Sequence, residues 1–191
     1  MATNAKLVAL SAPSGAGKST ICDMLLERNE NFQLSISTTS RAPRGGEGHG
    51  VEYFFLSEKE FLQKAENGEF LEYEQIHGNY YGTLKSTIEP LLAQGKITLF
   101  DVGVYGAMNL KKLYPENAIT FFIHAPSLAE LKRRLRLRKT EDEAQIQKRL
   151  QRLPEEYARA AFFDYQVVNE DREAITEKIE RLIRDHKFLQ D

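Results

Sequence analysis

The stretch SAPSGAGKST, residues 11–20, has the composition of a loop that holds phosphate groups. Such a loop needs glycines, so that bare backbone N–H groups can curl around phosphate oxygens, and a lysine that reaches the same charge. Gly17, Lys18 and Ser19 fit this pattern, whereas Ala12 stands where the pattern has its first glycine. The stretch therefore predicts a phosphate-binding loop (P-loop) made of Ala12, Pro13, Ser14, Gly15, Ala16, Gly17, Lys18, Ser19 and Thr20. The alternative is a turn rich in small residues between a strand and a helix.

The segments on either side of the loop favour the phosphate site. The apolar run Leu7 to Leu10 is typical of a buried strand, and Ile21, Met24 and Leu25 form a helical stripe directly after the loop. The N-terminus of that helix would point at the bound anion, where its backbone N–H groups and its dipole favour negative charge.

The remaining apolar runs predict a parallel sheet. Residues 97–102, 118–125 and 165–169 have the short continuous character of strands that are covered on both faces. They alternate with helical segments, and the last of these, residues 171–188, follows a capping Asp171 and carries apolar residues at helical spacing: Ile175, Ile179, Leu182 and Ile183. The sequence therefore predicts an α/β protein with a three-layer P-loop NTPase fold around a central parallel sheet.

Composition limits the class of partner. The chain has 191 residues, with 26 Lys and Arg against 28 Asp and Glu and a formal net charge of −2, which suits one domain. That charge argues against a nucleic-acid polymer or a membrane as the principal partner and leaves the oligomeric state open. The N-terminal residues have no apolar leader, so we expect a cytoplasmic protein. Cys22 is expected to be a small buried hydrophobe, and the four histidines are too scattered for a metal cluster.

A second anion site is indicated by SISTTSRAPRGGEGHGVEYFF, residues 35–55. Arg41 and Arg44 lie three residues apart, and their planar guanidinium groups give paired, charge-assisted hydrogen bonds to a phosphate. Tyr53 and Tyr81 are candidates to add hydroxyl donors. The alternative is a solvated basic loop beside two core tyrosines.

These motifs, with GEFLEYEQIHGNYYGT at residues 68–83 and VVNED at residues 167–171, resemble the guanylate kinase family in order and spacing. The resemblance covers nearly the whole chain. It implies a nucleoside monophosphate kinase that moves the γ-phosphoryl group of ATP, with Mg²⁺, onto GMP or dGMP. It also implies a single domain over residues 1–191, with a core at 1–34, 91–126 and 158–191, a GMP-binding insertion at 35–90 and a lid at 127–157.

The resemblance assigns a role to each candidate residue. The GMP phosphate would meet Arg41, Arg44, Tyr53 and Tyr81, and the guanine base would face Ser37, Glu72 and Thr83. Arg138 and Arg149 would be arginines of the lid, and Asn169 would lie by the adenine of ATP. Arg133 and Arg134 are interpreted as a solvated basic helix face.

Phosphoryl transfer is catalysed mainly by alignment and by charge stabilisation. Lys18 would bridge the β- and γ-phosphates, and Ser19 would ligate Mg²⁺. Asp101 ends a predicted strand and would hold the metal shell, unless it only caps a helix. The expected catalytic residues are therefore Lys18, Arg41, Asp101, Arg138 and Arg149.

The guanine assignment of Glu72 has a physical argument of its own. Guanine presents two donors on its Watson–Crick edge, N1–H and the 2-amino group, whereas adenine presents an acceptor at N1. A carboxylate accepts only, so it favours guanine. The alternative is a solvent-facing charge on a strand.

The chain departs from the family pattern Asp-Ile-Asp-x-Gln-Gly, because residues 101–106 read DVGVYG. Gly103 replaces the second acidic residue and Tyr105 the glutamine, so Tyr105 is a candidate substitute at the base and Gly103→Asp is expected to tighten GMP. Leu137 and Lys139, in place of glycines, flank Arg138. Two alternatives remain open: a kinase of the same fold with another acceptor, and a non-catalytic interaction module, which the intact P-loop disfavours.

Overall fold

The centre of the structure is a five-stranded sheet with the strand order β2-β7-β1-β8-β9. The structure is a computed structural model, and it describes residues 6–76, 78–137 and 143–186. Every neighbouring pair in this sheet is parallel, as the apolar runs predict. Its strands are β1 Lys6–Ser11, β2 Phe32–Ser35, β7 Ile97–Asp101, β8 Ala118–His124 and β9 Tyr165–Val168. The edge strand β2 is not among the strands predicted from the sequence.

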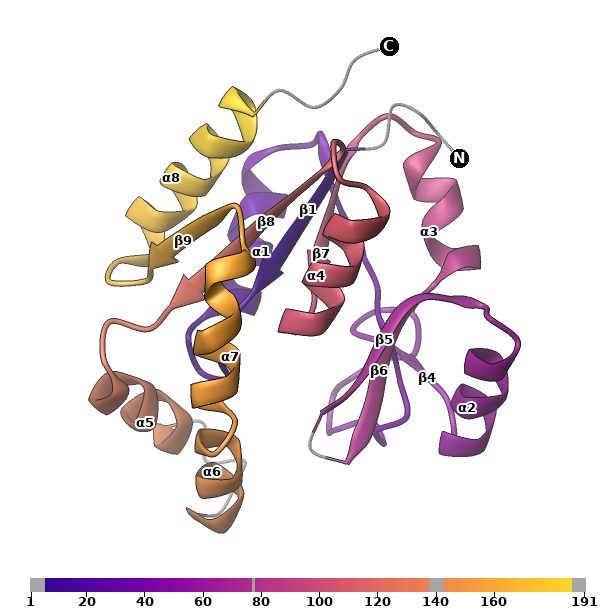
Figure 1. Cartoon of the computed structure of the whole chain (residues 1–191), viewed down its shortest axis with the longest axis horizontal. Coiled ribbons are helices and arrows are strands. Elements are labelled where there is room, and N and C mark those ends of the chain that lie inside the picture. The colour runs from indigo at the N-terminus through magenta and orange to yellow at the C-terminus, as the bar shows by residue number, and fades with distance from the viewer. Residues whose placement is uncertain (1–5, 77, 138–142, 187–191) are drawn as a thin grey trace.

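Side chains that alternate along β1 bury both faces of this sheet. Val8 and Leu10 pack under α1 (Lys18–Arg28) and α8 (Arg172–Asp185), whereas Leu7 and Ala9 pack under α3 (Lys85–Leu92) and α4 (Val104–Leu113). Figure 1 shows these helices on the two sides of the sheet. This arrangement is the predicted three-layer α/β fold.

The last helix agrees closely with its sequence pattern. The Asp171 side chain accepts a hydrogen bond from the backbone N–H of Ala174 at 2.9 Å, which satisfies a donor that the first turn would otherwise leave free. Ile175, Ile179 and Ile183 are buried against the sheet. The predicted cap and apolar stripe are therefore confirmed.

A second sheet, ordered β4-β3-β6-β5, lies below the right-hand side of the parallel sheet in Figure 1. Its strands are β3 Thr38–Thr39, β4 Phe54–Phe55, β5 Phe70–Ile76 and β6 Asn79–Leu84, and α2 Glu58–Glu66 covers it. Phe61 of α2 packs with Phe70 and Leu84 in a small core of its own. Ser57 and Glu60 form a capping box at the start of α2, so the helix has a defined beginning.

A helical arm lies on the other side, formed by α5 Leu128–Leu137, α6 Glu143–Leu150 and α7 Leu153–Arg159, followed by a 3₁₀ turn η1 Ala160–Phe162. Leu131 and Leu153 of this arm pack with Ala16 of the P-loop and with Ala125 at the end of β8. The arm is therefore fixed to the loop by apolar contacts. Among the described residues, no helix has the length and apolar character needed to cross a membrane.

We predict that Ile179→Ala destabilises the protein without altering its site. Ile179 is fully buried between α8 and the sheet, and removing such a side chain costs about 2–5 kcal/mol of the free energy of unfolding. Urea denaturation measures this loss. Lys178→Ala, at an exposed position of the same helix, is the control and should change stability by less than about 0.5 kcal/mol.

Candidate active site

The P-loop joins β1 to α1 as a tight turn that two glycines make possible. Gly15 and Gly17 have φ angles of 92° and 98°, a region that side chains with a Cβ rarely adopt. Gly17 is the N-cap of α1, so the unpaired N–H groups of the first helical turn lie at the loop. The strand–loop–helix unit predicted from the sequence is therefore present.

The lysine, the serine and the strand-end aspartate of the motif form one cluster. Lys18 Nζ lies 2.5 Å from Asp101 Oδ1 and donates to the Val102 carbonyl at 2.8 Å. Ser19 Oγ donates to Asp101 Oδ2 at 3.1 Å. Burial acts to lower the pKa of Lys18, but the charge of Asp101 and its hydrogen bond to the ammonium, with smaller contributions from Cys22 and Tyr53, together raise the pKa. Asp101 does not cap a helix, since the N-cap of α4 is Gly103.

The two arginines of the second anion motif are held by a carboxylate that the sequence analysis did not single out. Glu47 accepts from both terminal nitrogens of Arg41 at 2.9 Å and from the backbone N–H of Arg44 at 2.7 Å. The Arg41 guanidinium also lies 5.4 Å from the centre of the Tyr53 ring. This support fixes the plane of the Arg41 fork, which is the property that paired phosphate contacts require.

Glu72 lies in a buried polar pocket on β5. Its Oε1 accepts from the Thr83 hydroxyl at 2.7 Å, and a Cβ at Gly106 would lie 2.6 Å from its Oε2. Burial raises the pKa of Glu72 to about 7, although the Thr83 hydrogen bond opposes the shift and neighbouring Glu74 adds to it. Glu72 is therefore a buried acceptor and not the solvent-facing strand charge that the sequence left open.

One cleft of about 350 Å³ joins the P-loop to these two clusters. The sequence-predicted residues that line it are Ala12, Pro13, Ser14, Gly15, Gly17, Lys18, Ser19, Ser37, Arg41, Arg44, Tyr53, Glu72, Tyr81, Asp101 and Arg149. Thr83 reaches the cleft through Glu72, whereas Ala16, Thr20 and Asn169 are not part of its lining. Arg138 lies outside the described residues, and Arg149 reaches the loop by donating to Ser14.

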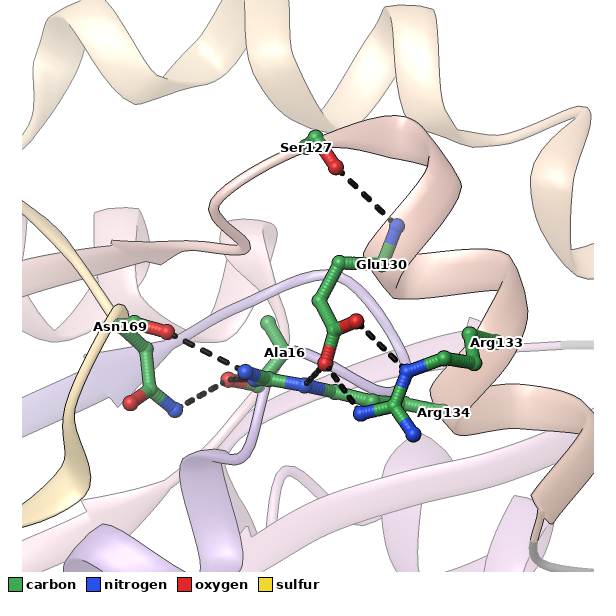
Figure 2. A network of polar contacts seen from close by, with 6 residues as sticks. All are labelled: Ala16, Ser127, Glu130, Arg133, Arg134 and Asn169. Carbon is green, nitrogen blue, oxygen red and sulfur yellow. Dashed lines mark hydrogen bonds and ion pairs between the residues drawn. The ribbon is translucent and has the colours of Figure 1, made fainter.

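Asn169 lies behind the P-loop in a network that Figure 2 shows. Its side-chain amide donates to the Ala16 carbonyl at 2.7 Å. Arg134 of α5 donates to the same carbonyl at 3.4 Å and to the Asn169 carbonyl at 3.3 Å, and Glu130 accepts from its Nε at 2.8 Å. The prediction of a solvated face is wrong for Arg134, which is half-buried and contacts the backbone of the loop. Arg133 is exposed and pairs with Glu130, as expected of such a face.

Comparison with known proteins decides the family. The model of the guanylate kinase family matches residues 4–186. The chain belongs to the guanylate kinase family. Guanylate kinase of Bacteroides thetaiotaomicron is 49% identical over 170 residues, which cover 88% of this chain and 83% of the relative. Guanylate kinase of Porphyromonas gingivalis is 46% identical over 180 residues, with 93% and 96% covered.

Solved structures agree with this membership. The crystal structure of guanylate kinase from Anaplasma phagocytophilum has a TM-score of 0.80 at 31% identity and covers 97% of this chain and 88% of its own. Shikimate kinase from Bacteroides thetaiotaomicron, at 14% identity, has a TM-score of 0.52, with 94% and 98% of the two chains covered, and shares the fold alone. As a member of the guanylate kinase family the chain is a phosphotransferase with a P-loop NTPase fold.

Sequence reasoning missed three carboxylates that line the cleft, namely Glu47, Glu74 and Glu156. Glu156 comes from α7, and burial raises its pKa to about 7 while the charges of Arg152 and Lys18 oppose the shift. For Glu74 a signal was present, because it lies two residues from Glu72 and side chains at that spacing share one face of a strand. The other two are brought to the cleft by tertiary packing, which their local sequence does not reveal.

We predict that Glu72→Gln changes how stability depends on pH. The unfolded carboxyl titrates near 4.5 and the folded one near 7, so between these values the folded state holds the extra proton. Stability contributed by this group therefore falls as pH rises from about 4.5 to 7, by at most about 1.4 kcal/mol per pH unit. The variant should lose that dependence, and urea denaturation at pH 5.5, 6.5 and 7.5 measures it.

The matched control for this experiment is Glu66→Gln, at an exposed position of α2. Its stability should follow that of the wild type at all three pH values. A Glu72→Gln protein whose stability changes in parallel with the wild type would contradict the raised pKa.

Proposed function

We propose that this chain transfers the γ-phosphoryl group of ATP to GMP and dGMP, producing ADP and the guanosine diphosphate. The observation that carries the proposal is one cleft that is lined both by the P-loop and by Arg41, Arg44 and Glu72. Two phosphate-binding groups that face one space suit a reaction in which one phosphate is passed to another. Membership of the guanylate kinase family supports the choice of substrates.

On the acceptor side, Arg41, Arg44, Tyr53 and Tyr81 would hold the GMP phosphate. All four line the cleft, and Glu47 orients the Arg41 fork before any ligand arrives. Glu72, Thr83 and Ser37 would receive the guanine edge. An ionised Glu72 accepts from N1–H and the 2-amino group but has nothing to offer the N1 acceptor of adenine.

On the donor side, the backbone N–H groups of the P-loop and the Lys18 ammonium would neutralise the ATP phosphates. Lys18 can do so because Asp101 and the Val102 carbonyl hold its Nζ at the mouth of the loop. Asn169, whose side-chain amide is hydrogen-bonded to the Ala16 carbonyl of the loop, would lie by the adenine.

The site also fits Mg²⁺. Ser19 Oγ and Asp101 Oδ2, 3.1 Å apart, are hard oxygen donors of the kind this ion prefers. Among the described residues no group of three or more His, Cys, Asp or Glu could form an all-protein metal cage, which suits an ion that takes its other ligands from phosphate and water. When bound, Mg²⁺ would neutralise charge on the transferring phosphate.

We assign the second sheet, within residues 35–90, to the acceptor and the helical arm, within residues 127–157, to a lid over the donor. Arg149, whose guanidinium reaches Ser14 of the P-loop, would stabilise charge during transfer, together with Arg138. The core would be residues 1–34, 91–126 and 158–191. The unpaired, buried Cys22 and the nucleotide substrates fit a cytoplasmic protein.

A nucleotide panel tests the proposed function. We predict ADP release in a coupled assay with GMP and dGMP and at least about a hundredfold lower kcat/KM with AMP, CMP and UMP, because each of these bases lacks the two adjacent donors. Lys18→Ala should abolish turnover while its circular dichroism stays that of the wild type, because the lysine acts on ligand charge. Preference for another monophosphate would identify a different acceptor, and activity in Lys18→Ala would contradict the P-loop assignment.

We further predict that Arg41→Ala and Arg44→Ala each raise KM for GMP while KM for ATP changes little. Hydrogen bonds to a charged phosphate contribute about 1.5–3 kcal/mol, so the expected increase is about ten- to a hundredfold. Steady-state kinetics with each nucleotide varied in turn measures both constants. The control is Arg28→Ala at the far end of α1, where the guanidinium pairs with Glu173 of α8. Equal losses for both nucleotides would remove these arginines from the acceptor site.

A further inference from the structure

Glu74 lies beside the proposed base pocket, and the proposed function assigns it no role. It lies two residues after Glu72 on β5, so both side chains project from the same face of that strand. Both carboxylates line the cleft. The chain therefore presents two neighbouring carboxylates, and not one, to whatever occupies this end of the cleft.

The first turn of α4 has a separate gap for each of these carboxylates. A Cβ at Gly103 would overlap Oε1 of Glu74, and a Cβ at Gly106 would come within 2.6 Å of Oε2 of Glu72. Gly103 has φ −75° and ψ 176°, an extended conformation that any residue can adopt. The backbone therefore does not require glycine at position 103, whereas the Glu74 carboxylate does.

The oxygens of the Glu74 carboxylate are buried against the start of α4. Among the described residues, neither of its oxygens has a hydrogen-bond partner of normal geometry. Burial raises the pKa of Glu74, and the charges of Arg152 and Lys18, with the Tyr105 backbone N–H, oppose this shift without cancelling it. A buried acceptor without a donor is costly, so a ligand that brings N–H groups to it gains what the free protein lacks.

Sequence spacing suggested Tyr105 as the substitute for the acidic residue missing at position 103. The Tyr105 side chain does not point toward the proposed base pocket. Its hydroxyl donates to Glu155 of α7, and the guanidinium of Arg159 lies 4.4 Å from the centre of its ring. It does not line the cleft. The carboxylate that the family pattern places at position 103 is therefore not replaced by the residue two places further along α4.

We propose that Glu74 is a specificity-determining residue for the acceptor base, and that its carboxylate, seated over Gly103, accepts from the donor edge of guanine beside Glu72. The inference rests on the proposed function and adds a residue to it. It also reverses the expectation that Gly103→Asp tightens GMP, because the new side chain and Glu74 would compete for one place with like charges.

The test is a cycle of variants in the coupled assay. Glu74→Gln and Glu74→Ala should each lower kcat/KM for GMP by about ten- to a hundredfold, mostly through KM, with KM for ATP within about twofold of the wild type. Gly103→Asp alone should also lose about tenfold or more. The double variant Glu74→Ala with Gly103→Asp should recover to within about fivefold of the wild type, because the aspartate then occupies the vacated place.

Recovery in the double variant is a result that a merely structural role of Glu74 would not produce. Gln75→Ala, an exposed neighbour on β5, is the control and should retain wild-type kinetics. Glu74→Gln keeps the shape of the side chain, so it tests the inference even where Glu74→Ala fails to fold, as thermal unfolding will report. Wild-type kcat/KM in Glu74→Gln, or a folded double variant no better than Glu74→Ala, would overturn it.

The same assay separates this inference from the function on which it rests. A wild-type protein that does not use GMP overturns the proposed function, and the inference with it. A wild-type protein that uses GMP beside an equally active Glu74→Gln overturns the inference alone.

Discussion

The cleft depends on one largely enclosed cation, the ammonium group of Lys18. Asp101 and the Val102 carbonyl hold it at the end of the parallel sheet, where the P-loop turns into α1. Its charge lowers the pKa of Glu72, Glu74 and Glu156, each of which burial raises. Arg152 opposes the same shift at Glu74 and Glu156, so the two cations together compensate the carboxylates of the cleft.

The cleft is suited to two opposite chemistries. A phosphate needs positive charge and N–H donors, whereas a guanine edge needs acceptors. The chain separates the two by element: α1 and the P-loop supply the donors, β5 supplies the acceptors, and Asp101 lies between the lysine and the serine. Glu47 repeats the arrangement on the acceptor side, where a carboxylate orients an arginine.

Much of this architecture could be predicted from short stretches of the sequence. The P-loop, the buried runs that became β1, β7, β8 and β9, and the Asp171 cap were predictable because each follows from a few adjacent residues. The strand β2 was not, since its burial comes from pairing with β7, far away in the sequence. The contacts of Glu47 and Arg134, and the place of Glu74 over Gly103, likewise arise between elements that the sequence does not show to be neighbours. The catalytic and binding roles of these residues remain predictions.

The first turn of α4 lies against β5 on one side and contacts α7 on another. Its glycines leave room for the carboxylates of β5. Tyr105, between them in sequence, donates to Glu155 in the first turn of α7 and lies against Arg159, the last residue of that helix. The same turn of α4 therefore borders the proposed base pocket and contacts α7 of the helical arm. We therefore expect a substitution that changes base preference at this turn to disturb the contacts between α4 and α7 as well.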